Sequence, residues 1–342
     1  MGSRPPTGDF AGNAAMGITE TDIMKKFRSA LKLCCLLCAL CLPGLETVAS
    51  PPAPKQFRSG VFINRINDFD VKSGTAELDF WYWVICDGDT PSLQNLELSN
   101  GKLEPVGDVI TQKRNGKNYV SRRYIAQAKC LVDMTKFPFD RQHIVLAFED
   151  SELTADQMVF VPDEVNSGID TEFLMNEWVT DRIAYQVKSH HYASSFGYLD
   201  IPAGQGSDYS QFVVTITMHR RGGFWQKLFK YFWAVVISVV VGLFSLLIRV
   251  CDLDGRFGMA VGALFANVGC SFLLSDKLPE SPNVSLAEWV SYISLGFIML
   301  FLVESIISLA IYNSGHEKFS KRLDLGVFAL SLLCYCGIWL FF

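Results

Sequence analysis

Four long apolar segments occupy the last third of the chain and constrain its fold more than any other feature. They run over residues 231–248, 257–274, 289–311 and 323–342, and each is close to the length that crosses a bilayer as a helix. Half of all residues are hydrophobic, which is high for a wholly soluble protein. Because backbone polar groups cannot stay unpaired in lipid, we expect a four-helix membrane domain over residues 222–342.

The chain begins with a sequence typical of export. From Met24 it is basic, then apolar over a short stretch, then rich in small residues up to Ser50, which is the pattern of a secretory signal. A membrane helix is the alternative, but the apolar run is too short to span comfortably. We therefore expect a signal peptide over residues 24–50, an unstructured upstream extension over residues 1–23, and residues 51–221 outside the cytoplasm.

Basic residues give conflicting evidence on orientation. The loop between the third and fourth segments carries Lys318, Lys321 and Arg322, as expected of a cytoplasmic loop. Lys227 and Lys230, at the outer start of the first segment, run against that rule. The signal decides the orientation. We predict a multi-pass protein of the cell membrane, the inner membrane in a bacterium, with its N-terminal domain in the periplasm or extracellular space.

Residues 51–221 have the two-residue periodicity of β-strands. Apolar residues alternate around Leu78 and Phe80 and again through Val214 and Ile216, while turns such as DGD, SNGK and RNGKN interrupt the pattern. Many short strands with turn signals favour an antiparallel, immunoglobulin-like sandwich of about ten strands. The predicted fold is an all-β extracellular sandwich followed by an all-α four-helix transmembrane domain.

The exported part lacks the sequence patterns of a disulfide-linked, zinc-binding or catalytic domain. Only Cys86 and Cys130 fall within it, and two cysteines so far apart give neither a disulfide framework nor a zinc spacing. The sequence has no G-x-S-x-G, no H-E-x-x-H and no phosphate-binding glycine loop, and its five histidines form no evident metal set. We therefore expect no enzyme, no cofactor and no nucleic-acid partner, with a membrane-bound enzyme as the chief rival.

The stretch CLVDMTKFPFDRQHI, residues 130–144, carries the most specific signal. An exported sandwich joined without a linker to four helices, with a Phe-Pro-Phe-Asp loop late in the sandwich, resembles the pentameric ligand-gated ion channels, the Cys-loop receptor superfamily. The residues that match the family's signature loop are Asp133, Phe137, Pro138, Phe139, Asp140 and Gln142. The resemblance covers about residues 57–342 and implies a homopentamer around a central pore, opened by an agonist bound between subunits.

Two departures resemble bacterial members of the family. Animal members have a second cysteine where this chain has Ile144, so the loop disulfide of the family cannot form and Cys130 is left single. The loop NSGHEKFSKR between the third and fourth segments is short, whereas animal members carry a large insertion there. The resemblance therefore indicates a bacterial type that lacks the loop disulfide.

In the family, the signature loop protrudes from the bottom of the sandwich into the membrane domain. The resemblance thus makes the two phenylalanines hydrophobic plugs around a stiff proline and places the aspartate near the arginine pair that precedes the first segment. For the letters FPF alone, a hairpin with core aromatics and a solvated aspartate is the simpler interpretation. We assign the coupling of binding to opening to Phe137, Pro138, Phe139, Asp140, Arg221 and Pro279.

The second apolar segment corresponds to the pore-lining helix of the family. Steps of three or four residues give a helical stripe with an acid at each end. The stripe consists of Asp254, Gly258, Gly262, Phe265, Gly269, Phe272 and Asp276. Arg256 and the Leu278-Pro279 pair occur at the separation found in the family and support this register. Five copies would place a ring of carboxylates at each mouth, which attracts cations, whereas acids that merely sit at helix ends are the alternative.

Three glycines and one acid in the membrane region are unusual. Each glycine costs about 0.5 to 1 kcal/mol relative to alanine inside a helix, and either a wide pore or close helix packing would explain it. On the pore reading, Phe265 is the expected apolar gate and Phe272 a second constriction. Glu304 lies within the third segment, and a functional role and a structural one are equally open.

The family binds agonists under the loop that joins the last two strands, here residues 189–210. Its aromatic residues suit an ammonium group, which is attracted to aromatic faces. The assigned ligand residues are His191, Tyr192, Phe196, Tyr198, Phe80, Tyr82, Glu149 and Asp150. Only one parity of the earlier strand can face the interface, so Trp81 and Trp83 are the alternative pair. The acids could pair with a cationic agonist or respond to protons, and a metal site at His190 and His191 is a weaker interpretation.

The sequence thus predicts a ligand-gated, cation-selective channel. Its partners are further copies of the chain, membrane lipid, permeant cations and a small-molecule agonist such as a cationic amine. A proton-gated channel of the same fold is the first alternative. A membrane-anchored ligand-binding protein that does not conduct is the second.

Overall fold

The computed structural model describes residues 53–340 apart from 89–91, 173–174, 198–203 and 282. It also describes five helical residues near the N-terminus, which are Met24, Lys25, Arg28, Ser29 and Lys32. The rest of the predicted signal peptide and the upstream extension lie outside the described residues. The chain divides into two compact units, Met1–Pro52 and Ala53–Phe342, and the second contains the strands and the long helices.

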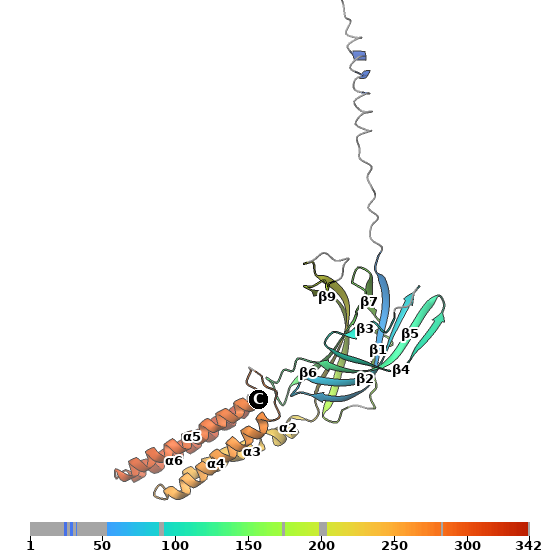
Figure 1. Cartoon of the computed structure of the whole chain (residues 1–342). Helices are drawn as coiled ribbons and strands as arrows, with labels where there is room; N and C mark the ends of the chain where they lie inside the picture. Colours follow the sequence, from blue (N-terminus) through green and yellow to red (C-terminus); the bar gives the residue numbers. More distant parts are fainter. Residues whose placement is uncertain are drawn as a thin grey trace, which may run out of the picture. The chain divides into compact units, whose positions relative to one another are not determined.

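The described strands form two sheets (Figure 1). The larger sheet has the order β4-β5-β2-β1-β7, with β8 also pairing with β1, and the smaller has the order β3-β6-β10-β9. Pairing is antiparallel except where β7 and β8 join β1. The bounds are β1 Lys55–Asp70, β2 Thr75–Asp87, β3 Leu96–Leu98, β4 Gly101–Arg114, β5 Lys117–Lys129, β6 Arg141–Asp150, β7 Met158–Pro162, β8 Gly168–Ile169, β9 Trp178–Tyr192 and β10 Ser207–Arg220.

The core of this sandwich is aromatic. Phe80 of β2 meets Phe148 of β6 edge to face, with 5.6 Å between the ring centroids, and Phe148 stacks on Phe212 of β10 at 6.2 Å. These three side chains are fully buried, and burying one Phe contributes about 1.5 to 3 kcal/mol. The predicted β-sandwich is therefore confirmed, and its hydrophobic core is large enough to hold the two sheets together.

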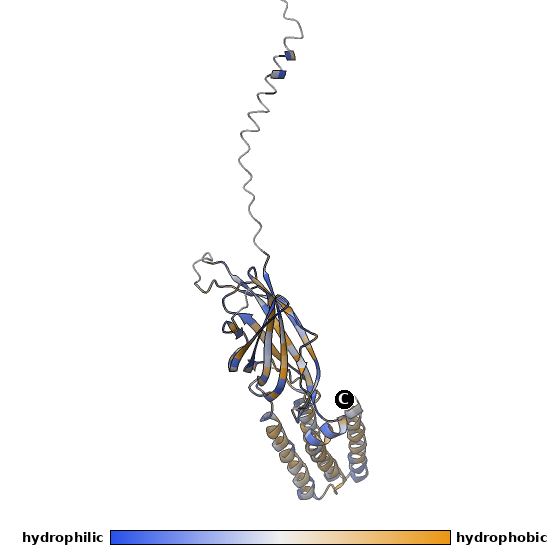
Figure 2. Ribbon diagram, turned by 90° about the vertical axis from the view of Figure 1, so that its right-hand side faces the viewer, coloured by the Kyte–Doolittle hydropathy of each residue, from blue (hydrophilic) through white to orange (hydrophobic). Residues whose placement is uncertain are grey.

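The helices follow β10 without a linker. They are α2 Phe224–Tyr231, α3 Trp233–Phe244 with the 3₁₀ turn η1 Ser245–Leu247, α4 Leu253–Ser275, α5 Leu286–Asn313 and α6 Glu317–Leu340. Side-chain caps begin two of the long helices: Gly255 donates its N–H to Asp252 at 3.2 Å, and Ser285 forms a capping box with Glu288. Hydrophobic residues follow α3 to α6 along their length (Figure 2).

Three helices, α4, α5 and α6, are long and apolar enough to cross a membrane. The first predicted span differs, because α2 and α3 are separate helices that meet at an angle of 63° around Phe232. Taken together they make a fourth candidate span. No proline causes this break. Instead α2 carries two lysines and packs on the sandwich, so its axis follows that surface rather than the axis of α3.

Candidate functional site

The signature loop between β5 and β6 lies against the helices. Phe137 is buried and packs edge to face on Tyr231 of α2, with ring centroids 4.9 Å apart. Phe139 stacks on Phe224 of α2 at 5.5 Å. Phe137 also belongs to an apolar cluster that includes Leu278, beyond the end of α4, and members of α3 and α5. Both phenylalanines therefore join the sandwich to the membrane helices through packing.

Asp140 forms a buried ion pair with the last residue of β10. Its carboxylate accepts from Arg220 Nε at 3.0 Å and from Gln142 Nε2 at 2.7 Å. The guanidinium of Arg220 also lies over the rings of Phe137, at 4.9 Å, and Trp178, at 4.5 Å. Arg221, which the sequence assigned to coupling, is exposed instead. The structure thus gives Arg220 the contact with Asp140 that was expected of the arginine pair.

Two further contacts at this junction were not expected from the sequence. Lys72, in the turn between β1 and β2, donates from Nζ to the Asp276 carboxylate at 3.1 Å and to its carbonyl at 3.0 Å. The backbone N–H of Leu286, at the start of α5, donates to the carbonyl of Thr135 at 2.9 Å. Two loops of the sandwich therefore hold the ends of α4 and α5. Pro279, half-buried, lies next to Leu278 in the same region.

The predicted stripe on α4 forms one exposed face of the protomer. All seven of its residues, Asp254, Gly258, Gly262, Phe265, Gly269, Phe272 and Asp276, are exposed. The opposite face is buried and contains Arg256, Ala260, Ala263 and Asn267. A Cβ added at any of the three stripe glycines would meet no other atom within 4 Å. Helix packing within the protomer therefore does not account for these glycines.

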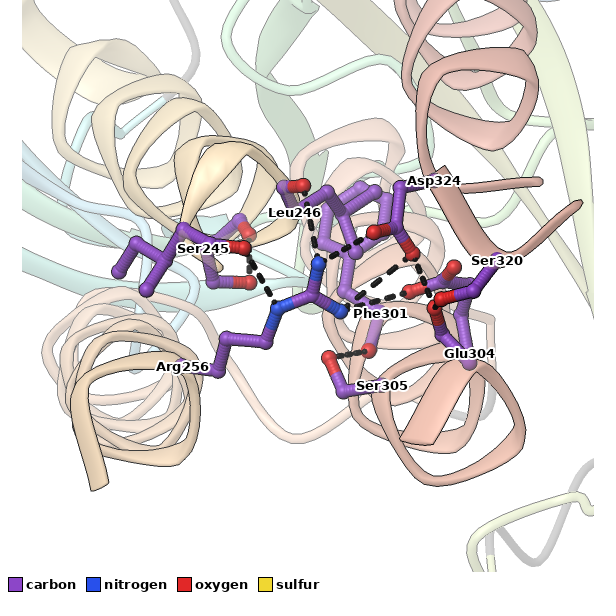
Figure 3. A network of polar contacts seen from close by, with 11 residues as sticks. Ser245, Leu246, Arg256, Phe301, Glu304, Ser305, Ser320 and Asp324 are labelled. Carbon is purple, nitrogen blue, oxygen red and sulfur yellow. Dashed lines mark hydrogen bonds and ion pairs between the residues drawn. The ribbon is translucent and has the colours of Figure 1, made fainter. Parts of the chain in front are cut away.

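A buried polar cluster joins α4 to the neighbouring helices (Figure 3). Arg256 pairs with Asp324 of α6 at 2.5 Å and lies 3.8 Å from Glu304 of α5. Its guanidinium also donates to the carbonyls of Ile248, at 2.9 Å, and Leu246, at 3.3 Å. Arg256 thus points away from the exposed stripe, and Glu304 faces a cation inside the bundle. Asp324 was not identified from the sequence, where it reads as one more charge near a helix start.

A second buried carboxylate, Glu149 of β6, lies beneath the loop between β9 and β10. It accepts from Tyr192 Oη at 2.8 Å, contacts His190 Nδ1 at 2.6 Å and also bonds the amide of Gln211. Burial and the neighbouring Glu149 raise the pKa of Tyr192. The structure therefore brings together two predicted ligand residues, Glu149 and Tyr192, and adds His190 and Gln211, which the sequence did not single out for this site.

Aromatic side chains surround Tyr192. Its ring meets Phe196 at 5.2 Å and Tyr209 at 5.7 Å, both edge to face. Phe196 is 58% exposed, so this aromatic group can be reached from outside. Tyr198 lies outside the described residues.

The remaining predicted ligand residues are placed elsewhere. His191 points away from Glu149 and pairs with Asp208 at 2.9 Å, so adjacent His190 and His191 face opposite sides of the strand and cannot share one metal ion. Asp150 is buried and accepts two backbone N–H groups of the following turn, and burial raises its pKa.

The parity of β2 is resolved by burial. Phe80 and Tyr82 are fully buried in the core, which prevents them from touching a ligand between subunits. Trp81 and Trp83 point to the other face of the sheet, where Trp83 Nε1 donates to Asp163 at 3.1 Å. The sequence carries a signal for this parity, because Glu77 and Asp79 lie on the same side of the strand as Trp81 and Trp83 and mark it as the polar face.

Comparison with known proteins gives one distant similarity. No family model matches the chain. The serotonin-gated chloride channel mod-1 of Caenorhabditis elegans is 24% identical over 199 residues, which are 57% of this chain and 36% of that protein. This suggests the pentameric ligand-gated channel superfamily. The chain spans about a third of the length of this curated relative, so the similarity supports the type of architecture described above and not a particular ligand.

Proposed function

We propose that the chain is a subunit of a ligand-gated ion channel, assembled as a homopentamer with α4 around the pore. The observation that carries this proposal is the exposed stripe of α4. It is spaced for one helical face and has an aspartate at each end, and its three glycines have no packing partners among the described residues of the protomer. The distant similarity to a ligand-gated channel supports the same function. We further propose the bacterial type, with the sandwich outside the inner membrane.

A lipid-facing stripe is the main alternative, and its composition argues against it. Three glycines would give up about 0.5 to 1 kcal/mol each without any packing in return. Asp254 and Asp276 at its two ends would meet headgroups rather than water. Around a pore, glycines leave room for ions, and exposed carboxylates face water at both mouths. One helix cannot enclose a channel, so this arrangement requires several copies.

We propose that a small-molecule agonist binds beneath the loop between β9 and β10. Glu149 is already bonded by three donors of its own protomer, so its role is to orient Tyr192 rather than to contact the ligand. The aromatic faces of Tyr192 and Phe196 remain for a cationic amine, and each such contact contributes about 0.5 to 2 kcal/mol. The relative is named for serotonin, which makes serotonin the first probe.

Proton gating is the second candidate function. It is favoured by the contact between His190 and the buried carboxylate of Glu149. A histidine is the side chain whose charge changes most readily near neutral pH. His190 and Tyr192 share this carboxylate, so a change at the histidine would change how Tyr192 is held. Currents evoked by acid alone, and abolished by His190→Gln, would support this function over amine gating.

We propose cation selectivity, carried mainly by Asp254. Asp276 pairs with Lys72, which weakens the field of the outer ring. Among the described residues, Asp254 has no ion-pair partner and would act undiminished at the inner mouth. The relative is named a chloride channel, so selectivity needs its own measurement.

Current recording from the purified full chain in planar bilayers tests both the proposed channel and its proposed cation selectivity. In a potassium chloride gradient, the wild-type reversal potential should approach the potassium equilibrium value, and Asp254→Asn should move it toward zero. Glu280→Gln removes an exposed acid outside the stripe and is the matched control. Reversal at the chloride value would refute cation selectivity only. A monomer as the sole species in detergent, with no current under serotonin or acid, would refute the channel.

A further inference from the structure

The two lysines that conflict with the usual charge rule line a cavity at the start of the first span. This cavity has a volume of about 270 Å³ and lies between the end of β10 and α2. Its lining includes Arg220, Arg221, Lys227 and Lys230, against a single acid, Glu177. Such an excess of positive charge in one hollow requires a reason, because like charges that share a cavity repel one another.

Most of this charge is not neutralised by the protein. Arg220 is paired with Asp140. Among the residues that the structure describes, no carboxylate lies within ion-pair distance of Arg221, Lys227 or Lys230. Three cations are therefore available on the walls of a cavity whose volume would hold a phosphate group.

The position of the cavity relative to the membrane follows from the aromatic residues beside it. Trp225 and Phe229 lie four residues apart on one side of α2, and the ring of Phe229 lies 5.1 Å from that of Trp233 at the start of α3. Their exposed fractions are 67%, 54% and 52%. Exposed Trp at the start of a span is typical of the boundary between headgroups and acyl chains. In Figure 1, α2 lies between the sandwich and α3. We therefore place the cavity beside α2 at headgroup depth, in the leaflet on the side of the sandwich.

We propose that this cavity binds the headgroup of an anionic phospholipid. Arg221, Lys227 and Lys230 would bind the phosphate, with Gln226 on the same wall as a further donor. The acyl chains would lie along Trp225, Phe229 and Trp233. A zwitterionic choline headgroup would bring its own cation toward three others, so phosphatidylcholine would bind less well. This site explains why Lys227 and Lys230 occur on the outer side, and it does not depend on whether the protein conducts ions.

Lipid retention by the full chain tests the site. The protein is purified in detergent with equal amounts of phosphatidylglycerol and phosphatidylcholine, and the lipid bound after gel filtration is measured by mass spectrometry. The wild type should retain phosphatidylglycerol preferentially. Each lysine near an anionic phosphate changes affinity about fivefold, so Lys227→Gln with Lys230→Gln should weaken retention about 25-fold. Arginine at both positions should preserve it, which separates loss of charge from misfolding.

The matched control is the pair Lys102→Gln and Lys113→Gln on β4, which removes the same charge from two exposed positions of the sandwich. Its retention should equal that of the wild type. Soluble glycerol phosphate, which has the same charged group without chains, should displace the lipid poorly. Equal retention of phosphatidylcholine, unchanged retention in the double glutamine variant, or full displacement by glycerol phosphate would each overturn the proposal. The last result would indicate a free phosphate, and the second would indicate that the retained lipid binds elsewhere on the protein.

Discussion

Removing the guanidinium of Arg220 should be the most costly single change at the junction between sandwich and helices. The side chain of Asp140 is 1% exposed and that of Arg220 is 11% exposed, so the pair is largely removed from water. Arg220→Met keeps most of the volume but leaves the carboxylate buried, with Gln142 as its one remaining side-chain donor among the described residues. Loss of one partner from a buried pair costs about 3 to 5 kcal/mol.

A double-mutant cycle tests this reasoning through the free energy of unfolding. The double variant Asp140→Asn with Arg220→Met should lose less unfolding free energy than the sum of the losses in the two single variants, because neither charge then remains buried alone. We expect an interaction energy of about 1 to 3 kcal/mol. Urea unfolding of the full chain in detergent, followed by tryptophan fluorescence, gives these values, and Trp178 reports directly because Arg220 lies over its ring at 4.5 Å.

The control is Arg141→Met. Arg141 forms a loose ion pair with Asp181 at 3.7 Å on the surface of the same region, with its side chain 73% exposed. A surface pair of this kind contributes about 0 to 1 kcal/mol. If Arg220→Met costs no more than this control, or if the two changes at the junction are strictly additive, the ion pair does not hold the junction and our account of it is wrong.

Three further predictions concern the pore, the agonist site and the stability of the sandwich. Phe265→Ser should raise the current without agonist more than Phe272→Ser, because Phe265 lies deeper in the stripe. Equal resting leak in membranes with matched expression would place the gate elsewhere. Tyr192→Phe removes the hydroxyl that bonds a buried carboxylate, and half-activation by serotonin should then need about tenfold more ligand, since a hydrogen bond to a charged group is worth about 1.5 to 3 kcal/mol. Hydrogen bonding from Arg123 lowers the pKa of Asp79 below its usual value, so its stabilisation is complete above about pH 4 and is lost as the pH falls through the lowered pKa. Arg123→Gln should therefore reduce stability at neutral pH and flatten the acid limb of a plot of unfolding free energy against pH, whereas an unchanged acid limb would contradict this assignment.

The arginine at the junction could have been identified from the sequence. Residues Ile216 and Met218 of β10 are buried in the core, and Arg220 continues the same alternation. Period two therefore directs Arg220 inward and Arg221 outward. If the two arginines are taken as one pair, this difference is hidden, and the role falls to the exposed Arg221 instead of the buried Arg220.

The break between α2 and α3 could not be read from hydropathy alone. The hydropathy of the segment that starts at residue 231 is uniformly apolar across the turn at Phe232, and no proline or glycine marks the change of direction there. The cause lies outside the segment. Phe224, Leu228 and Tyr231 pack against the signature loop, so the direction of α2 is set by residues of the sandwich more than 80 positions earlier in the chain.

The parity of β2 could have been predicted by extending its alternation, because Glu77 and Asp79 share the side of Trp81 and Trp83. The partners of Arg256 were beyond the sequence. The fold class was predictable because turn signals and apolar lengths are local. Pairings between distant elements, such as Arg256 with Asp324, depend on how helices rotate against one another, and a single sequence does not record that rotation.

The cluster around Arg256 also sets an order of events during synthesis. Arg256 and Asp324 are 68 residues apart, so α4 enters the membrane long before its principal counter-charge has been made. Until α6 follows, the guanidinium has only Glu304 and backbone carbonyls as partners in an interior that is costly for any charge. The bundle is therefore completed by its last helix, and a nascent chain halted before α6 would hold Arg256 without its principal counter-charge.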